Sequence, residues 1–174
     1  AARLVSAALQ AAGLPVAADA SRGLDHGAWV PLRMMFPEAD IPVIPLSIQS
    51  SGDAAYHYRL GQALSGLPAQ GILIVATGSI THNLCDYQLA EMNGGQTPAY
   101  VHEFARWIAD QLAAGDTEAL LDYRQRAPEA RRAHPSDEHL LPLYVALGTA
   151  GKTATAERFH AGIDDYVIAM DAYA

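Results

Sequence analysis

Residues Gly71 to Leu84 read Gly-Ile-Leu-Ile-Val-Ala-Thr-Gly-Ser-Ile-Thr-His-Asn-Leu, and this stretch decides the fold class. Its apolar run Ile72–Ala76, rich in β-branched residues, predicts a strand covered on both faces. A Thr-Gly-Ser turn follows, and His82 comes four residues after Gly78. Ligands of open α/β sheets bind beyond the carboxyl ends of the strands, so His82 is placed for chemistry there. An interpretation with equal weight is that His82 only caps the loop.

Composition indicates a single globular domain spanning residues 1–174. Apolar residues make up 51% of the 174 and charged residues 17%, which excludes a disordered chain. The formal net charge of −8 and the lack of a basic cluster exclude nucleic acid and anionic membrane surfaces as partners. No apolar run approaches the ~20 residues of a membrane span. The single cysteine, Cys85, excludes an internal disulfide, fits a reducing cytoplasmic location and is expected to be a small packed thiol.

A second strand is predicted at Ile41–Ile48, interrupted or near an edge because Pro42 and Pro45 cannot donate to a ladder. The amphipathic helix predicted at Asp53–Leu67 joins it to Ile72–Ala76, with the length of a right-handed βαβ crossover. The expected fold is therefore α/β, with a mostly parallel or mixed central sheet and helices on both faces, in three layers.

The remaining segments complete this prediction. Two of them bear on the site: the loop Asp86–Gln96, long enough to act as a lid, and a helix over Asp137–Gly148 that Ser136 caps. The chain opens within a helix, without an initiating Met or an N-cap, so we expect an N-terminal part to be missing. The other expected elements are helices over Ala1–Ala12, Ala28–Phe36, Pro98–Ala114 and from Thr117, a connector over Gly151–Glu157 and a closing strand over Tyr166–Ala174.

Two further histidines are candidates for chemistry. His26 follows Asp25, and a neighbouring carboxylate can orient an imidazole as a general acid/base requires; a turn residue satisfied by backbone is the alternative. His139 is expected near the start of its helix, where the dipole favours a neutral imidazole. That state suits metal ligation, and a buried histidine bonded to the preceding loop is the alternative. No pair has zinc-finger or His-Glu-x-x-His spacing. Of the other histidines, His57 is expected at the surface boundary and His102 in solvent. The sequence does not decide whether His134 and His160 face the site or only cap a loop.

Four motifs in order resemble one family: Ser21–Leu32, Ile41–Ile48, Gly78–Leu84 and His134–Leu143. It is the class III extradiol ring-cleavage dioxygenases, in the DOPA 4,5-dioxygenase-like branch related to the catalytic subunit of protocatechuate 4,5-dioxygenase. The resemblance runs from about Ser21 to Met170. It implies a non-haem Fe(II) site, which Zn(II) can also occupy, and cleavage of a catecholic substrate with O2.

By motif match the resemblance gives each histidine a role. His82 stands at the metal site as ligand or acid/base, His139 is a metal ligand, and His26 handles substrate or dioxygen from the second shell. The family's N-terminal portion, which supplies two further ligands and the first strands, has no counterpart here. The chain is therefore expected to be the C-terminal two-thirds of such a domain, to bind iron weakly or not at all, and to be inactive alone. A homo-oligomer is left open. Alternatives on the same architecture are a zinc-binding, non-catalytic Memo-like protein and a metal-dependent hydrolase.

Overall fold

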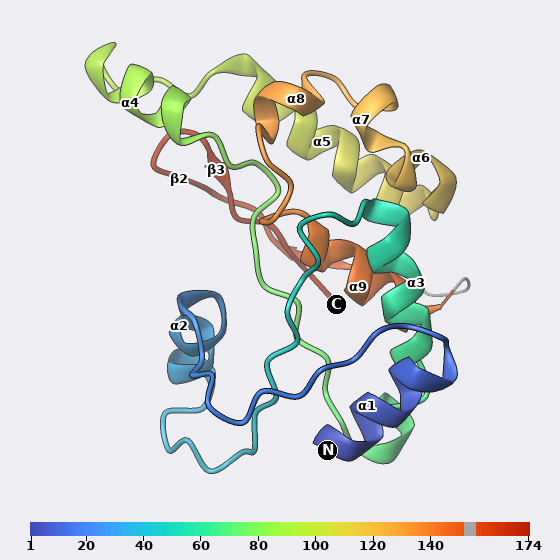
Figure 1. Ribbon diagram of the computed structural model, residues 1–174. Coiled ribbons are helices and arrows are strands. Elements are labelled where there is room, and N and C mark those ends of the chain that lie inside the picture. The colour runs from blue at the N-terminus through green and yellow to red at the C-terminus, as the bar shows by residue number, and fades with distance from the viewer. Residues whose placement is uncertain (152–155) are drawn as a thin grey trace.

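The computed structural model describes residues 1–151 and 156–174 (Figure 1). No helix in this part of the chain is long and apolar enough to cross a membrane. Most of the described regular structure is helical, and the strands are short and confined to the C-terminal segment. The elements are α1 Ala2–Ala11, α2 His26–Met35, α3 Ala54–Leu64, the 3-10 helix η1 Pro68–Gln70, α4 Leu84–Met92, α5 Ala99–Ala114, α6 Thr117–Leu121, α7 Tyr123–Arg126, α8 Ala130–Ala133, α9 Leu141–Ala150, β1 Arg158–His160, β2 Ile163–Asp164, β3 Ile168–Ala169 and β4 Ala172–Tyr173.

Helices α3 and α9 pack closely because each has a glycine at the contact. A Cβ at Gly61 of α3 would collide with the carbonyl oxygen of Val145, and one at Gly148 of α9 with that of Tyr58. Close backbone approach of this kind is a position that only glycine fills without displacement. The α3 helix starts as its sequence predicts, since the Asp53 carboxylate accepts the N–H of Tyr56 at 2.8 Å.

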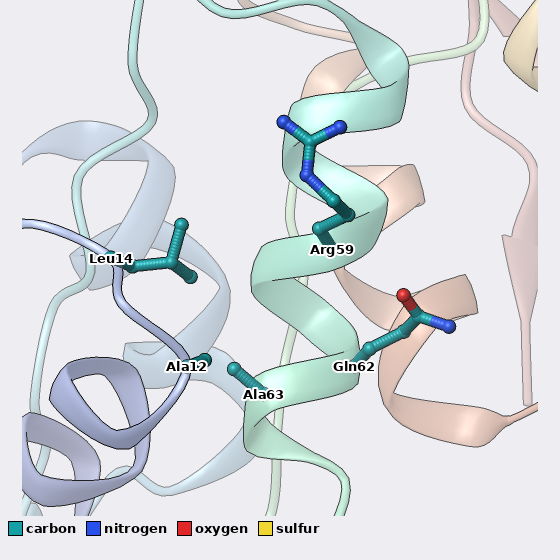
Figure 2. Close-up of a pocket in the computed structure, with 5 residues that line it drawn as sticks. All are labelled: Ala12, Leu14, Arg59, Gln62 and Ala63. Atoms are coloured by element: carbon teal, nitrogen blue, oxygen red, sulfur yellow. The ribbon is translucent and has the colours of Figure 1, made fainter.

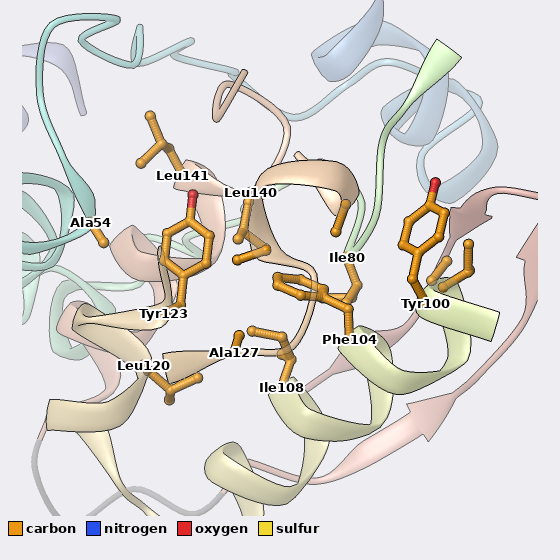
Figure 3. Packing of buried hydrophobic residues seen from close by; sticks show 14 of the residues in the cluster. Ala54, Ile80, Tyr100, Phe104, Ile108, Leu120, Tyr123, Ala127, Leu140 and Leu141 are labelled. Atoms are coloured by element: carbon orange, nitrogen blue, oxygen red, sulfur yellow. The ribbon is translucent and has the colours of Figure 1, made fainter. Parts of the chain in front are cut away.

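The main core forms where α5 meets α6, α7 and the start of α9 (Figure 3). Phe104 and Ile108 of α5 are completely buried, and Tyr123 and Tyr144 stack with ring centroids 5.8 Å apart. The Tyr144 hydroxyl donates to the Leu120 carbonyl at 3.0 Å, which satisfies its polar atom inside the core. The turn that carries His82 is hydrogen-bonded to this half of the molecule. Figure 1 shows α2 standing apart from it.

The sheet differs from the prediction. The described residues form two antiparallel pairs, β1 with β4 and β2 with β3, and no ladder includes Ile41–Ile48 or Ile72–Ala76. Both segments are extended, as their β-branched residues favour, but a strand also needs a hydrogen-bonded neighbour and neither has one among the described residues. The predicted strands there are wrong as stated, and the three-layer arrangement stays a prediction. The closing strand expected at Tyr166–Ala174 is instead the two short strands β3 and β4.

Two helices also differ from expectation. The expected lid Asp86–Gln96 is largely the helix α4, because the Asn83 side chain accepts the N–H groups of Cys85 and Asp86 and caps it. The helix expected from Asp137 begins only at Leu141, so Ser136 caps nothing and its hydroxyl donates instead to the Glu138 carboxylate. Of the expected connector Gly151–Glu157, residues 152–155 lie outside the described part of the chain.

Two residue environments are corrected as well. His57, expected at the surface boundary, is completely buried, and its Nε2 accepts the Gln49 N–H at 3.1 Å while Nδ1 lies 2.8 Å from the Asp53 carbonyl. These bonds hold the loop before α3 and make His57 structural. Cys85, expected to be packed, is exposed on the first turn of α4.

Candidate active site

His82 and His139 lie against one another. Their rings stack with centroids 3.7 Å apart and planes 21° from parallel, although the residues are far apart in sequence. Both side chains are partly buried. The structure therefore brings together the two imidazoles that the sequence analysis placed at a metal.

The turn Gly78–His82 is fixed against His139 by backbone contacts. The Ser79 N–H donates to the His139 carbonyl at 2.9 Å. A Cβ at Gly78 would overlap that same carbonyl oxygen, so the Gly-Ser turn is needed for the two segments to touch. Gly78, which the sequence pattern places in a turn, is thus also the residue at which the turn contacts the backbone of His139.

Every residue from Ile80 to His82 is also tied to the core. The Ile80 N–H donates to the Ala169 carbonyl at 2.8 Å, and the His82 N–H donates to the Ala133 carbonyl at 2.9 Å. The Thr81 hydroxyl donates to the Val167 carbonyl at 2.8 Å and accepts the Ala169 N–H at 2.8 Å. These bonds to two separate segments fix the backbone of the turn from which the His82 side chain extends.

His134, whose environment the sequence did not decide, is hydrogen-bonded to this turn. It is completely buried, and its Nε2–H donates to the Ile80 carbonyl at 2.7 Å. Its Nδ1 is buried with no hydrogen-bond partner among the described residues, which assigns the neutral tautomer protonated at Nε2. Burial lowers the pKa of His134 from the ordinary 6.5 to about 4, so the ring stays neutral near pH 7.

Burial also lowers the pKa of both stacked imidazoles. For His82 the nearby His139 adds to the effect, and for His139 the charge of His26 does so. Glu138 opposes the shift in both rings because its carboxylate favours a neighbouring positive charge. Glu138, which directly precedes His139, is a site residue that the sequence analysis did not single out. Near neutral pH the pair is expected to be uncharged, which is the state that binds metal ions.

His26 lies at the first position of α2, capped by the Asp25 carboxylate, which accepts the Ala28 N–H at 3.2 Å. The start of α2 is joined to the site turn because the Thr77 hydroxyl donates to the Gly27 carbonyl at 2.6 Å. His26 is exposed and makes no ring contact with the stacked pair. The three histidines are therefore arranged as a contacting pair with a third on the adjoining helix.

The imidazole nitrogens of His82 and His139 could supply part of the ligand set of a metal site. Two neutral imidazoles are suitable ligands for Fe(II) or Zn(II), but catalytic sites use three or more protein ligands. Within residues 1–151 and 156–174, no group of three or more His, Cys, Asp or Glu is placed to hold a metal ion. His102 and His160 are exposed on α5 and β1 and are not part of such a group.

Two surface hollows lie away from this pair. One, of about 360 Å³, is lined by Ala12 and Leu14 after α1 and by Arg59, Gln62 and Ala63 of α3 (Figure 2). The other, of about 530 Å³, lies between α5 and the C-terminal strands. Neither is lined by His82 or His139, so the candidate site rests on its side-chain chemistry and not on a cavity.

Comparison with known proteins then assigns the family. The family model described as the catalytic LigB subunit of aromatic ring-opening dioxygenase matches residues 2–168. The chain belongs to this family. The resemblance to class III extradiol dioxygenases seen in the sequence is thereby confirmed.

Individual relatives agree with the family match. The chain is 43% identical over 155 residues to the 4,5-DOPA dioxygenase extradiol of Beta vulgaris, covering 89% of this chain and 57% of the relative. It is 36% identical over 142 residues to the enzyme of the same name from Escherichia coli K12, covering 79% and 51%. The crystal structure of an uncharacterized protein from Escherichia coli K12 superimposes with a TM-score of 0.84 and 31% identity, covering 98% of this chain and 69% of that one. The chain thus shares this protein's fold and spans little more than half the length of the curated relatives.

Proposed function

We propose that this chain carries the His82–His139 part of the metal site of an extradiol dioxygenase that opens a catecholic ring with O2. The main support for this proposal is the stacked, partly buried pair of imidazoles at the turn Gly78–His82, both of which have lowered pKa values. The relatives named 4,5-DOPA dioxygenase extradiol support a catechol of the DOPA class as substrate. Fe(II) is the proposed metal and Zn(II) its substitute; when bound, the iron would supply the centre at which catechol and O2 meet.

The residues of this chain have distinct proposed roles. His139 would be a ligand, because its backbone is held by Ser79 and its ring is neutral. His82 would act beside it as ligand or as the base that accepts a catechol proton at a ring nitrogen and later returns it. His26, exposed on the adjoining helix, would contact the substrate or dioxygen from the second shell. Glu138 would favour the protonated form of His82 after proton transfer, since its charge opposes the lowering of the His82 pKa.

Metal titration tests the site. We expect calorimetry with Zn(II) to give weak binding to the unaltered chain, because two imidazoles are fewer ligands than a tight site needs. His139→Ala should remove this binding. The matched control is His102→Ala, which deletes an exposed imidazole on α5. Binding that is unaffected by His139→Ala, or tight stoichiometric binding by the unaltered chain, would contradict the proposed two-ligand site.

Activity is tested separately. The chain is reconstituted anaerobically with Fe(II), mixed with DOPA and exposed to air while O2 uptake and absorbance are recorded. We expect the chain alone to show little uptake, for the same reason that binding is weak. Turnover to a yellow ring-opened product that His82→Ala abolishes would support the dioxygenase assignment and contradict the expected inactivity. Hydrolysis of an ester by the Zn(II) form would instead favour a hydrolase.

A further inference from the structure

The connection His134–Glu138 carries the chain from α8 to His139 without a helix or strand of its own. It ends in a turn, because the Asp137 carbonyl accepts the N–H groups of Leu140 at 2.8 Å and Leu141 at 3.0 Å. Both leucines are buried in the main core. His139 therefore lies inside a turn that the core fixes at its far end, and the place of its ring also depends on what holds Asp137.

Arg124 of α7 holds this connection at both ends. Its Nη1 donates to the His134 carbonyl at 2.6 Å, and a longer bond from the same atom reaches the Ala130 carbonyl at 3.4 Å. Its Nε donates to one oxygen of the Asp137 carboxylate at 3.3 Å, while Nη2 pairs with the other oxygen. Two-point binding of a carboxylate by the planar guanidinium fixes direction as well as distance. One side chain thus spans the connection that leads to His139.

Arg124 is itself anchored in the core. The preceding Tyr123 is buried and stacks on Tyr144 of α9. The guanidinium carbon of Arg124 lies 5.3 Å from the centroid of the Tyr123 ring, within the range of a cation–π contact. The side chains of Arg124 and Asp137 are only 27% and 28% exposed. Exposed ion pairs contribute little, but a bidentate and partly buried pair is an exception. All of these contacts are made between residues of this chain.

We infer that Arg124 is a positioning residue for the metal site. By holding the His134 carbonyl and the Asp137 carboxylate together, it keeps the His139 ring stacked on His82 in the metal-free chain. A ligand that is not held in place must be ordered when the metal binds, and residues that support ligands typically contribute about 10- to 100-fold to metal affinity. This inference rests on the proposed function where it concerns the metal, but the stacking of the two rings can be measured without any metal.

NMR of the histidine rings tests the inference, first without metal and then during titration with Zn(II). With ring centroids 3.7 Å apart, His82 and His139 should give a nuclear Overhauser effect between their ring protons. In Arg124→Gln we expect this effect to be lost and the dissociation constant for Zn(II) to rise about tenfold. The matched control is Arg126→Gln, which removes an exposed arginine of the same helix whose ion pair with Asp116 spans 3.7 Å. Both measurements on this control should equal those on the unaltered chain.

A second variant, Arg124→Lys, separates two-point binding from charge alone. Lysine keeps a positive charge near Asp137, but its ammonium group lacks the planar fork that binds both carboxylate oxygens. We expect its dissociation constant for Zn(II) to lie closer to that of Arg124→Gln than to that of the unaltered chain. Circular dichroism and urea unfolding verify that each variant is folded under the NMR conditions, so that a lost ring contact reports on the connection and not on unfolding. If Arg124→Gln does not fold, the lysine variant provides the test.

The inference and the proposed function fail separately. A folded Arg124→Gln chain that keeps the contact between the rings, or an Arg124→Lys chain that binds Zn(II) as the unaltered chain does, would overturn the positioning role. If His139→Ala removes Zn(II) binding while Arg124→Gln alters neither measurement, the metal site stands and the positioning role is wrong. If Arg124→Gln abolishes the ring contact but His139→Ala leaves Zn(II) binding unchanged, Arg124 does position His139 and the proposed metal site is wrong.

Discussion

Acid should destabilise the protein through His134. Its imidazole is completely buried and donates to the Ile80 carbonyl, and burial holds its pKa at about 4 instead of 6.5. Because the folded pKa is depressed, the folded state favours the neutral ring. The stability that this contributes is fully present above pH 6.5 and is lost as the pH falls from 6.5 towards 4. The difference between the two pKa values corresponds to roughly 3 kcal/mol, of which about 2.5 kcal/mol is lost by pH 4.5.

The measurement is urea unfolding at pH 7.5 and pH 4.5 of the unaltered chain and of His134→Gln. Glutamine carries an amide N–H that can donate to the Ile80 carbonyl and does not titrate in this range, so carboxylates and other histidines affect both proteins alike. The unaltered chain should lose about 2.5 kcal/mol more between the two pH values than His134→Gln does. Equal losses in the two proteins would show that His134 is not kept neutral by burial, and would refute the reasoning.

Three further predictions concern the supports of the site. Gly78→Ala should lower the free energy of unfolding by about 2 kcal/mol or more, because the added Cβ would overlap the His139 carbonyl. The control Gly66→Ala, whose Cβ would contact no other atom, should change this free energy by less than about 0.5 kcal/mol. Equal effects of the two substitutions in urea titrations would contradict the prediction. Asp86→Ala should cost about 1–2 kcal/mol, since it removes the mostly buried carboxylate that accepts the Arg132 Nε–H at 2.7 Å; an unchanged melting temperature would refute this. Zn(II) binding should be constant above neutral pH and should weaken only below pH 6.5, because burial lowers the pKa of His139 and protonation removes this imidazole as a ligand. Loss of binding that begins at pH 7 would contradict a lowered pKa.

The helices could be predicted from sequence where local signals suffice. The amphipathic pattern and the Asp53 cap give α3, and the pattern of Val101, Ile108 and Leu112 gives α5, whose end at Gly115 is a left-handed C-cap. The helix α4 was missed although Asn83 is a good N-cap, because its residues carry almost no amphipathic pattern and glycines follow it. Local signals therefore located helices with a clear apolar stripe and failed for one without.

The strands could not be predicted because pairing is not a local property. Ile72–Ala76 has the composition of a buried strand, yet Leu73 lies largely in solvent and the segment has no ladder among the described residues. The meeting of His82 and His139 was anticipated only through a family resemblance, since no spacing rule relates residues so far apart. The role of His134 depends on a carbonyl more than fifty positions away in the chain, which no pattern in the sequence indicates.

The glycine contacts between α3 and α9 also govern how the two site rings can separate. Leu141, the first residue of α9, comes two positions after His139, and Gly61 and Gly148 leave no free space between the two helix backbones. Movement of His139 by sliding α9 would force backbone atoms into one another. A molecule that binds between the two imidazoles is therefore expected to displace the turn that carries His82. Relatives that accept larger substrates should then differ in residues 78–84 and not in the contact between α3 and α9.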